Sequence, residues 1–226
     1  MENTQKTIYP EPVIAQENAS SYGNTFMEVN FREIDSMGID PNTGLWNGGG
    51  KIAFVFGKRN TDMSLLDKFT FYLSFPEFYN LMHRIENDVL CKNCDAERNR
   101  VNENPDVQPQ PVYVFHPAGT PAEKLTGDRF RGEGVAESRS LSIVPCTRSK
   151  SAQIQFVAER GDGKKLQNGL IAPKYDRSSK DPKVYFRVAV GFSYSEFIGK
   201  FLFLKQVVDG VINKWAAGSA FLPKQV

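Results

Sequence analysis

Cysteine is scarce in this sequence, with three among 226 residues. Three cysteines do not make a disulfide framework, and no basic-apolar-small leader opens the chain. We therefore expect a protein of the cytoplasm, either nucleoid-associated or in a phage-infected cell. Uncharged apolar runs are lacking as well, because the longest run, residues 197–215, contains Lys200, Lys205, Asp209 and Lys214. Such charges are costly in a bilayer, so this run predicts a buried helix and no membrane contact.

Motifs for catalysis and cofactor binding are also missing. The GGGK of residues 48–51 is not a P-loop, because Leu45 occupies the first glycine position and Ile52 replaces Ser or Thr. The GEG of residues 132–134 lacks the third glycine of a dinucleotide fingerprint. Neither histidine has a nucleophile beside it in sequence. We predict a protein that is not an enzyme and holds no cofactor.

A metal site has one weak signal. Cys91 and Cys94 have zinc-knuckle spacing, and Cys146, His83 and His116 could supply further ligands. A single CxxC without a second pair is more often two ordinary thiols. We predict no metal.

Net charge is only +2, but it is unevenly distributed. Residues 1–50 hold seven acidic against two basic side chains, a net of −5. Residues 147–187 hold ten basic against four acidic side chains, a net of +6. The basic segment favours a polyanionic partner, of which a phosphate backbone is the commonest, although a solvated loop is the alternative.

What the sequence does contain is a pattern that occurs twice. The SFPEF of residues 74–78 reappears as the SYSEF of residues 193–197. Two upstream segments match in the same order: 52–55 with 154–157, and 68–71 with 183–186. The order indicates two copies of one unit, in which strands lead into a capped helix.

The first copy is predicted to contain strands at 26–31, 51–57 and 68–74, with a short one near Leu45-Trp46. Ser74 and Glu77 have capping-box spacing. They open a helix to about Leu90, whose apolar positions form one face: Phe78, Leu81, Met82, Ile85 and Val89.

The second copy is predicted to contain strands at 111–116, 140–144, 153–158 and 183–192. Residues 161–182 read as a polar insertion. Ser193 and Glu196 repeat the capping box and open a helix to about Trp215. That helix is apolar on nearly every side, which is typical of a central helix or a subunit interface.

These patterns predict an α+β protein of two tandem ββββα repeats, with antiparallel sheets packed with two helices. We expect the two repeats to form one domain. The predicted division is a disordered arm at 1–23, repeats at 24–90 and 111–216, a linker at 91–110 and a tail at 217–226.

Alternate side chains of a strand point to opposite faces. In 183–190, apolar side chains occupy one face, and Lys183, Tyr185 and Arg187 the other. In 68–75, Lys68 and Tyr72 likewise oppose an apolar face. Exposed rings can stack on bases while Lys and Arg contact phosphates, although ordinary cross-strand pairs are the alternative. The candidate stacking residues are Trp46, Tyr72, Tyr113 and Tyr185; the candidate phosphate contacts are Lys51, Lys68, Lys164, Lys165, Lys183 and Arg187.

In repeat pattern and architecture, residues 24–216 resemble the Whirly and Pur families of single-stranded nucleic-acid-binding proteins. The resemblance implies nucleic acid lying across strand surfaces, with helices in the core or the oligomer interface. The candidate contacts correspond to those of the families by role only.

We therefore expect a sequence-independent single-stranded DNA-binding protein, with RNA possible, that acts in replication, recombination or transcription. Residues 197–215 are the expected self-association surface of a dimer or tetramer. The alternative is a structural or scaffolding protein, for instance of a virion, that binds no nucleic acid.

Overall fold

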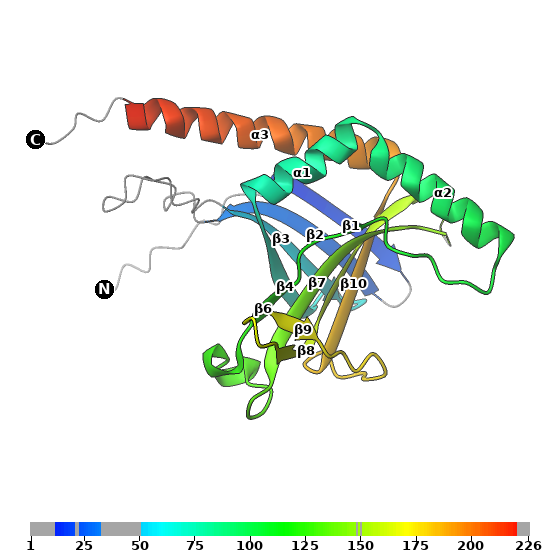
Figure 1. The fold of residues 1–226 in the computed structure, drawn as a ribbon. Coiled ribbons are helices and arrows are strands. Elements are labelled where there is room, and N and C mark those ends of the chain that lie inside the picture. Colours follow the sequence, from blue (N-terminus) through cyan, green and yellow to red (C-terminus); the bar gives the residue numbers. More distant parts are fainter. Residues whose placement is uncertain (1–11, 21–22, 33–50, 148, 150, 221–226) are drawn as a thin grey trace, which may run out of the picture.

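The computed structural model describes residues 12–20, 23–32, 51–147, 149 and 151–220. In this part of the chain the strands form two antiparallel sheets, and helices lie across one end of both (Figure 1). The α+β class, the tandem repeats and the antiparallel sheets are confirmed. The expected strand near Leu45-Trp46 lies outside the described residues.

The first sheet is a meander in the order β1 (Ile14–Ser20), β2 (Gly23–Arg32), β3 (Lys51–Arg59) and β4 (Leu65–Ser74). β1 corrects the prediction of a disordered arm at 1–23, because it pairs with β2 along its whole length. On the inner face of β1, buried Ile14 is followed by Gln16 and Asn18. This polar continuation removes the apolar alternation by which a strand is recognised.

Helix α1 (Phe75–Glu86) follows β4 directly and begins with the expected capping box of Ser74 and Glu77. Helix α2 (Val89–Glu103) corrects the prediction of a linker at 91–110. Asp88, at φ 57°, separates the two helices. The buried side chains of α2 are confined to its first turns, at Leu90, Cys91 and Cys94. The rest of the helix is polar, so no apolar stripe marks it in the sequence.

The second sheet has the order β10-β8-β7-β5. Its strands are β5 (Tyr113–Val114), β7 (Ala136–Pro145), β8 (Ile154–Lys165) and β10 (Tyr185–Phe192). Two short strands extend it: β6 (Ala118–Thr120) pairs with β7, and β9 (Ile171–Pro173) pairs with β8. Two short 3₁₀ helices, η2 (Ala122–Lys124) and η3 (Gly127–Arg129), lie between β6 and β7.

Two boundaries in the second sheet differ from the prediction. The strand expected at 111–116 has two paired residues. The insertion expected at 161–182 begins as strand, because β8 continues to Lys165 and pairs with β9. Gly161 and Gly163 interrupt the apolar pattern there. Their missing side chains make room for Tyr175 and Ile171, which pack over the strand.

Helix α3 (Tyr194–Ala220) ends the second repeat and extends past the expected Trp215. One face is buried in the core, through Phe197, Phe201, Leu204 and Val208. On the opposite side Phe203 is 54% exposed. The prediction of a buried, central helix therefore holds for one face of α3 only.

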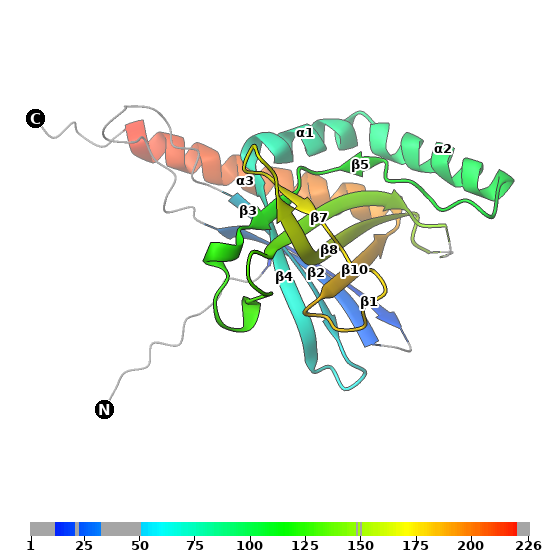
Figure 2. The same cartoon turned by 60° about the horizontal axis from the view of Figure 1, so that its bottom comes forward.

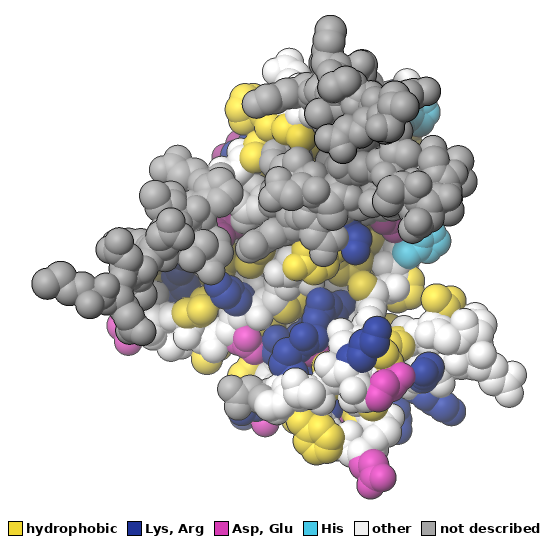
Figure 3. All heavy atoms as spheres, turned by 90° about the vertical axis from the view of Figure 1, so that its left-hand side faces the viewer, with side chains coloured by type: hydrophobic (Ala, Val, Ile, Leu, Met, Phe, Trp, Pro, Cys, Tyr) yellow, Lys and Arg dark blue, Asp and Glu magenta, His cyan; other side chains and the backbone are white. Residues whose placement is uncertain are grey.

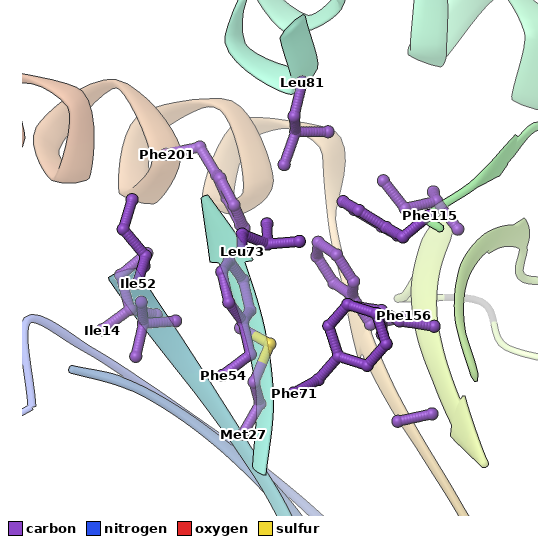
Figure 4. Packing of buried hydrophobic residues seen from close by; sticks show 14 of the residues in the cluster. Ile14, Met27, Ile52, Phe54, Phe71, Leu73, Leu81, Phe115, Phe156 and Phe201 are labelled. Atoms are coloured by element: carbon purple, nitrogen blue, oxygen red, sulfur yellow. The ribbon is translucent and has the colours of Figure 1, made fainter. Parts of the chain in front are cut away.

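One hydrophobic core joins the inner faces of both sheets with α1 and α3. Figures 1 and 2 show how these elements are arranged. Phe156 of β8 lies at its centre (Figure 4), with its ring centroid 6.0 Å from that of Phe54 in β3 and 5.5 Å from that of Phe201 in α3. Leu81 contributes from α1. Because the same aromatic ring contacts both repeats, the two share their packing rather than forming separate cores.

Side chains of each sheet bind the edge strand of the other. Asn18 and Thr25 of the first sheet donate hydrogen bonds to the carbonyls of Gly191 and Ala189 in β10, at 3.2 and 2.9 Å. At the opposite corner, Arg139 of β7 donates to the Thr70 carbonyl of β4 at 3.0 Å. These bonds satisfy edge groups that would otherwise face solvent.

None of the described helices is both long enough and apolar enough to span a membrane.

Candidate nucleic-acid interface

A cleft of about 680 Å³ opens where β4 of the first sheet meets the ends of β7 and β8 in the second. The segment between β6 and β7 and the turn before β10 close its other sides. Its lining residues are Leu66, Asp67, Lys68, Phe69, Thr70, Tyr72, Thr120, Arg129, Phe130, Arg131, Glu137, Arg139, Arg160, Pro182 and Lys183. We call this site the inter-sheet cleft.

The inter-sheet cleft is strongly positive. Six of its lining residues are Lys or Arg, against two acidic residues, Asp67 and Glu137, which gives a net charge of +4. Figure 3 shows the corresponding side of the molecule, where dark blue Lys and Arg side chains gather beside yellow hydrophobic ones. Cations concentrated in a concave site attract polyanions.

Two of the cations, Arg139 and Arg160, occupy inward-facing strand positions in line with residues of the hydrophobic core. On the inner face of β7, Ile143 and Leu141 are followed by Arg139 and Glu137. On β8, Ala158 is followed on the same face by Arg160, which pairs directly opposite Arg139. The inner face of the second sheet therefore changes from apolar to charged where it leaves the core.

Glu137 holds the arginines at this charged end of the second sheet in place through ion pairs. Its side chain is 3% exposed, and its carboxylate lies 2.5 Å from Arg139, 3.0 Å from Arg129 and 3.5 Å from Arg131. Burial opposes ionisation, but Arg139 and Arg129 outweigh it and hold the pKa of Glu137 below its usual value. Three guanidinium groups on one carboxylate leave positive charge in excess, so the group can still attract an anion.

Ion pairs also hold the side chains of Arg131 and Arg160 in place. The Arg131 side chain is 7% exposed and binds Asp162 at 3.0 Å. Arg160 binds Asp67 and the Pro182 carbonyl, and its guanidinium lies 5.7 Å from the centre of the Phe69 ring. Within the described residues, the buried Nε atoms of both arginines have no hydrogen-bond partner. Because these atoms are buried, both arginines act on an anion through their charge, and their positions are fixed in advance.

Exposed apolar and aromatic side chains border these cations. Phe130 is 61% exposed and Tyr72 is 42% exposed, and both line the inter-sheet cleft together with Leu66. Exposure of a large ring costs hydrophobic stabilisation, whereas a nucleobase can stack on it.

Of the predicted contacts, Lys68, Tyr72 and Lys183 come together in the inter-sheet cleft. Lys51 lies at the other end of the first sheet, opposite Ser74. Lys164 and Lys165 end β8, where Lys165 forms an ion pair with Glu123 at 3.1 Å. Trp46 lies outside the described residues.

Tyr185 and Arg187 lie on the outer face of the second sheet. The Tyr185 hydroxyl donates to Glu159 at 2.5 Å, and its ring centroid lies 5.6 Å from that of Tyr175. Burial and Glu159 raise the pKa of Tyr185 to about 12. Tyr113 is on the opposite, core side, against Phe115 at 4.7 Å between ring centroids. It is thus separated from the other candidate rings.

Sequence reasoning missed most of the residues of the inter-sheet cleft, among them Arg129, Phe130, Arg131, Arg139 and Arg160. Two signals were present. The run at 129–131 alternates basic, aromatic and basic side chains, as a contact loop for nucleic acid does. Arg139 and Arg160 occupy strand positions in phase with buried residues, which marks a charge held inside the protein.

The two thiols of the CxxC segment are buried in α2. Burial is the largest cause of a pKa raised to about 11 for Cys91 and about 12 for Cys94. Both are therefore thiols rather than thiolates at neutral pH. In the part of the chain that the structure describes, no three His, Cys, Asp or Glu side chains form a group that could hold a metal.

The fold and the inter-sheet cleft define an α+β protein of two tandem ββββα repeats, with a cationic, aromatic-edged cleft between its sheets. No family model matches the chain, and no curated protein matches it. Among solved structures it is similar to the plant transcriptional regulator PBF-2, with 13% identity and a TM-score of 0.45. The match covers 96% of this chain and 100% of that one.

Proposed function

We propose that this protein binds single-stranded nucleic acid in the inter-sheet cleft. The observation that carries the proposal is the combination in one cleft of six cations with the exposed rings of Tyr72 and Phe130. Lys68 and Lys183 contact phosphates at the mouth, and the arginines around Glu137 supply the positive field beneath them.

The cationic side chains and the aromatic rings of the inter-sheet cleft contribute to binding in different ways. The cations neutralise phosphates without reading sequence. The rings offer stacking surfaces worth about 1–3 kcal/mol per base, and any base can use them. A duplex hides the faces of its bases, so the rings favour a single strand.

This chemistry fits a strand-coating role in replication, recombination or transcription, in the cytoplasm wherever single strands are exposed. DNA is the first expected ligand, and RNA presents the same phosphates and base faces. The remaining predicted contacts, among them Lys51, Lys164 and Lys165, would extend the footprint beyond the inter-sheet cleft.

The direct test is a fluorescence-anisotropy titration of a labelled ~30-mer single strand, the matching duplex and an RNA of the same sequence, at two salt concentrations. We expect the single strand to bind more tightly than the duplex. Affinity should fall steeply with salt, because counterions are released from each neutralised phosphate. No binding at low salt would overturn the proposal and leave the scaffolding alternative.

Variants of the inter-sheet cleft separate stacking from charge. Tyr72→Ala and Phe130→Ala should each weaken binding by about fivefold or more while leaving the salt dependence unchanged. Lys68→Ala and Lys183→Ala should each reduce the slope of log affinity against log salt by about one. Leu170→Ala is the matched control, because Leu170 is 57% exposed but does not line this cleft.

The exposed side of α3 supports self-association into a dimer or tetramer. Phe203 and Leu202 leave an apolar surface on the helix face opposite the core, and a second copy of the chain would bury it. Sedimentation of the unaltered protein and of Phe203→Glu tests this. We expect the variant to be monomeric, and a monomeric unaltered protein would contradict the assembly.

A further inference from the structure

We propose that a second pocket, on the outer face of the second sheet, receives one nucleobase of the strand bound in the inter-sheet cleft. This inference rests on the proposed function and adds a base-reading subsite to it. The pocket has a volume of about 680 Å³ and is lined by Val101, Asn102, Pro105, Val107, Gln108, Pro109, Cys146, Thr147, Gln155 and Arg187. We call it the amide pocket.

The lining of the amide pocket is chemically unlike that of the inter-sheet cleft. It holds one cation, Arg187, where the cleft holds six. Three amide side chains, Asn102, Gln108 and Gln155, stand among Val and Pro side chains. The accessible lining is more polar than apolar, and amide donors and acceptors match the edges of a base, whereas a phosphate requires cations.

Hydrogen bonds hold one wall of the amide pocket, the loop 104–110, in place before any ligand binds. The loop 104–110 is tied to α2 through Glu97, which accepts two hydrogen bonds from Arg100 at 2.7 and 2.6 Å and one from the Gln110 backbone N–H at 2.5 Å. Arg100 in turn donates to the Gln108 carbonyl at 3.0 Å. The bonds from Arg100 are the main reason why the pKa of Glu97 falls to about 2. A preformed wall lowers the entropy cost of binding.

The amide pocket borders β10, and the inter-sheet cleft borders the turn that precedes this strand. Lys183 lines the inter-sheet cleft, and Arg187 lines the amide pocket. The four residues from one to the other span at most about 13 Å when extended, which is within the reach of about four stacked nucleotides at ~3.4 Å each. Tyr185 lies between them on the same side of the strand as Arg187. A strand can therefore run from the cleft past Tyr185 to the pocket.

The surface beside this path is compatible with a polyanion. Glu159 is the acidic side chain opposite Arg187, and its carboxylate is already bound by Tyr185 and by Arg177 at 3.4 Å. The neighbouring outward positions carry small side chains, Ser142 and Ala189. Between Ser142 and Ala189 lies buried Val157, and the Tyr175 ring packs against Tyr185, so the nucleic-acid strand would follow the surface of these side chains.

The test uses labelled 12-mers of dT, dC and dA with the full chain at one moderate salt concentration. We expect the unaltered protein to distinguish at least two of them by about tenfold, and Gln155→Ala to abolish the difference with an unchanged salt slope. Gln155→Asn, which keeps the amide but shortens it, serves if the Ala variant unfolds, and should reduce the same ratio. Lys92→Ala, on exposed α2 surface, is the control for both.

Strand length gives a second readout. Arg187→Ala should weaken the 12-mers severalfold but leave 3-mers unaffected, because a 3-mer is too short to reach from the inter-sheet cleft to the amide pocket. Equal affinity of the unaltered protein for all three 12-mers, or an unchanged ratio in both Gln155 variants, would overturn the amide pocket while leaving the proposed function standing. No binding of any 12-mer would overturn the proposed function itself.

Discussion

The two repeats share a strand order but differ at the end of the sheet that lies away from the helices. In the first sheet the inner face has Phe56 opposite Phe69 and then ends in the pair Lys58 and Asp67. In the second sheet the equivalent face ends in the pair Arg139 and Arg160, with Glu137 beyond it. The difference is that Lys58 faces a carboxylate, whereas Arg160 faces a second guanidinium, so the second sheet brings an excess of positive charge to the inter-sheet cleft.

The described connections between strands also differ between the two repeats. In the first repeat, residues 60–64 suffice to join β3 to β4. In the second repeat, long segments between β5 and β7 and between β8 and β10 carry η2, η3, β6 and β9. These insertions contribute Arg129, Phe130, Arg131 and Lys183 to the inter-sheet cleft. Nine of the fifteen residues that line the cleft come from the second repeat, and six, including Lys68 and Tyr72, come from the first.

The largest expected effect tests whether the repeats are one cooperative unit. Phe156→Ala should cost about 3–5 kcal/mol of unfolding free energy, because the ring is fully buried among aromatic rings of both repeats. Urea denaturation should show one transition, shifted as a whole. Leu170→Ala, at an exposed side chain, should change stability by less than about 0.5 kcal/mol. Two transitions in the Phe156 variant would show that the repeats unfold separately.

The next effect tests the charged end of the second sheet. Glu137→Gln should destabilise the protein by about 3 kcal/mol, because it leaves Arg129, Arg131 and Arg139 without their shared carboxylate. Urea denaturation at pH 7 measures the difference. Glu123→Gln, which breaks an exposed ion pair with Lys165, is the control and should cost less than about 1 kcal/mol.

The same variant has a defined pH dependence. The folded pKa of Glu137 lies below the ordinary value of 4.5, so its ionised form contributes its full stabilisation above pH 4.5. That contribution is lost as pH falls through the lower, folded pKa. The stability gap between the unaltered protein and Glu137→Gln should therefore narrow in acid. A gap that stays constant from pH 7 to pH 3 would contradict the assignment.

A smaller effect tests the contact between the helices of the two repeats. The Tyr79 hydroxyl of α1 donates to Asp209 of α3 at 2.5 Å, and burial followed by this bond raises the pKa of Tyr79. Tyr79→Phe should cost about 1–2 kcal/mol, measured by thermal or urea unfolding. Tyr72→Phe, at a solvent-facing ring, is the matched control. Equal losses in the two variants would argue against a helix-to-helix role.

The smallest effect compares the repeated motif directly. Ser74→Ala and Ser193→Ala each remove a capping box that the structure shows in full, and each should cost about 1 kcal/mol. Near-equal losses in urea denaturation are expected, because both serines bond a glutamate three residues on. A large difference would show that one cap has a further role.

The sequence predicted the fold where side-chain patterns and burial agree. The alternation of Phe69, Phe71 and Leu73 located β4, and the repeated Ser-x-x-Glu located both helix starts. It failed where polar side chains face inward to bond backbone, as Asn18 does in β1, or where a helix buries only its first turns, as α2 does. In both cases long-range contacts, which no local pattern records, stabilise the element.

The candidate site was predictable in part for a similar reason. Lys68, Tyr72 and Lys183 are exposed on strand or turn positions, and their alternation is visible locally. Arg139 and Arg160 become part of a site only because β4 lies against them. Their role depends on how the two sheets pack.

The bonds between each sheet and the edge of the other also set an order of events during synthesis. β4 leaves the ribosome well before Arg139 and Arg160, and β1 and β2 well before the β10 carbonyls that Asn18 and Thr25 bind. Until the second repeat is complete, the first sheet exposes an open edge strand and a face of phenylalanines. The nascent chain is therefore most prone to aggregation midway through translation, and slow synthesis of residues 104–135 would lengthen that period.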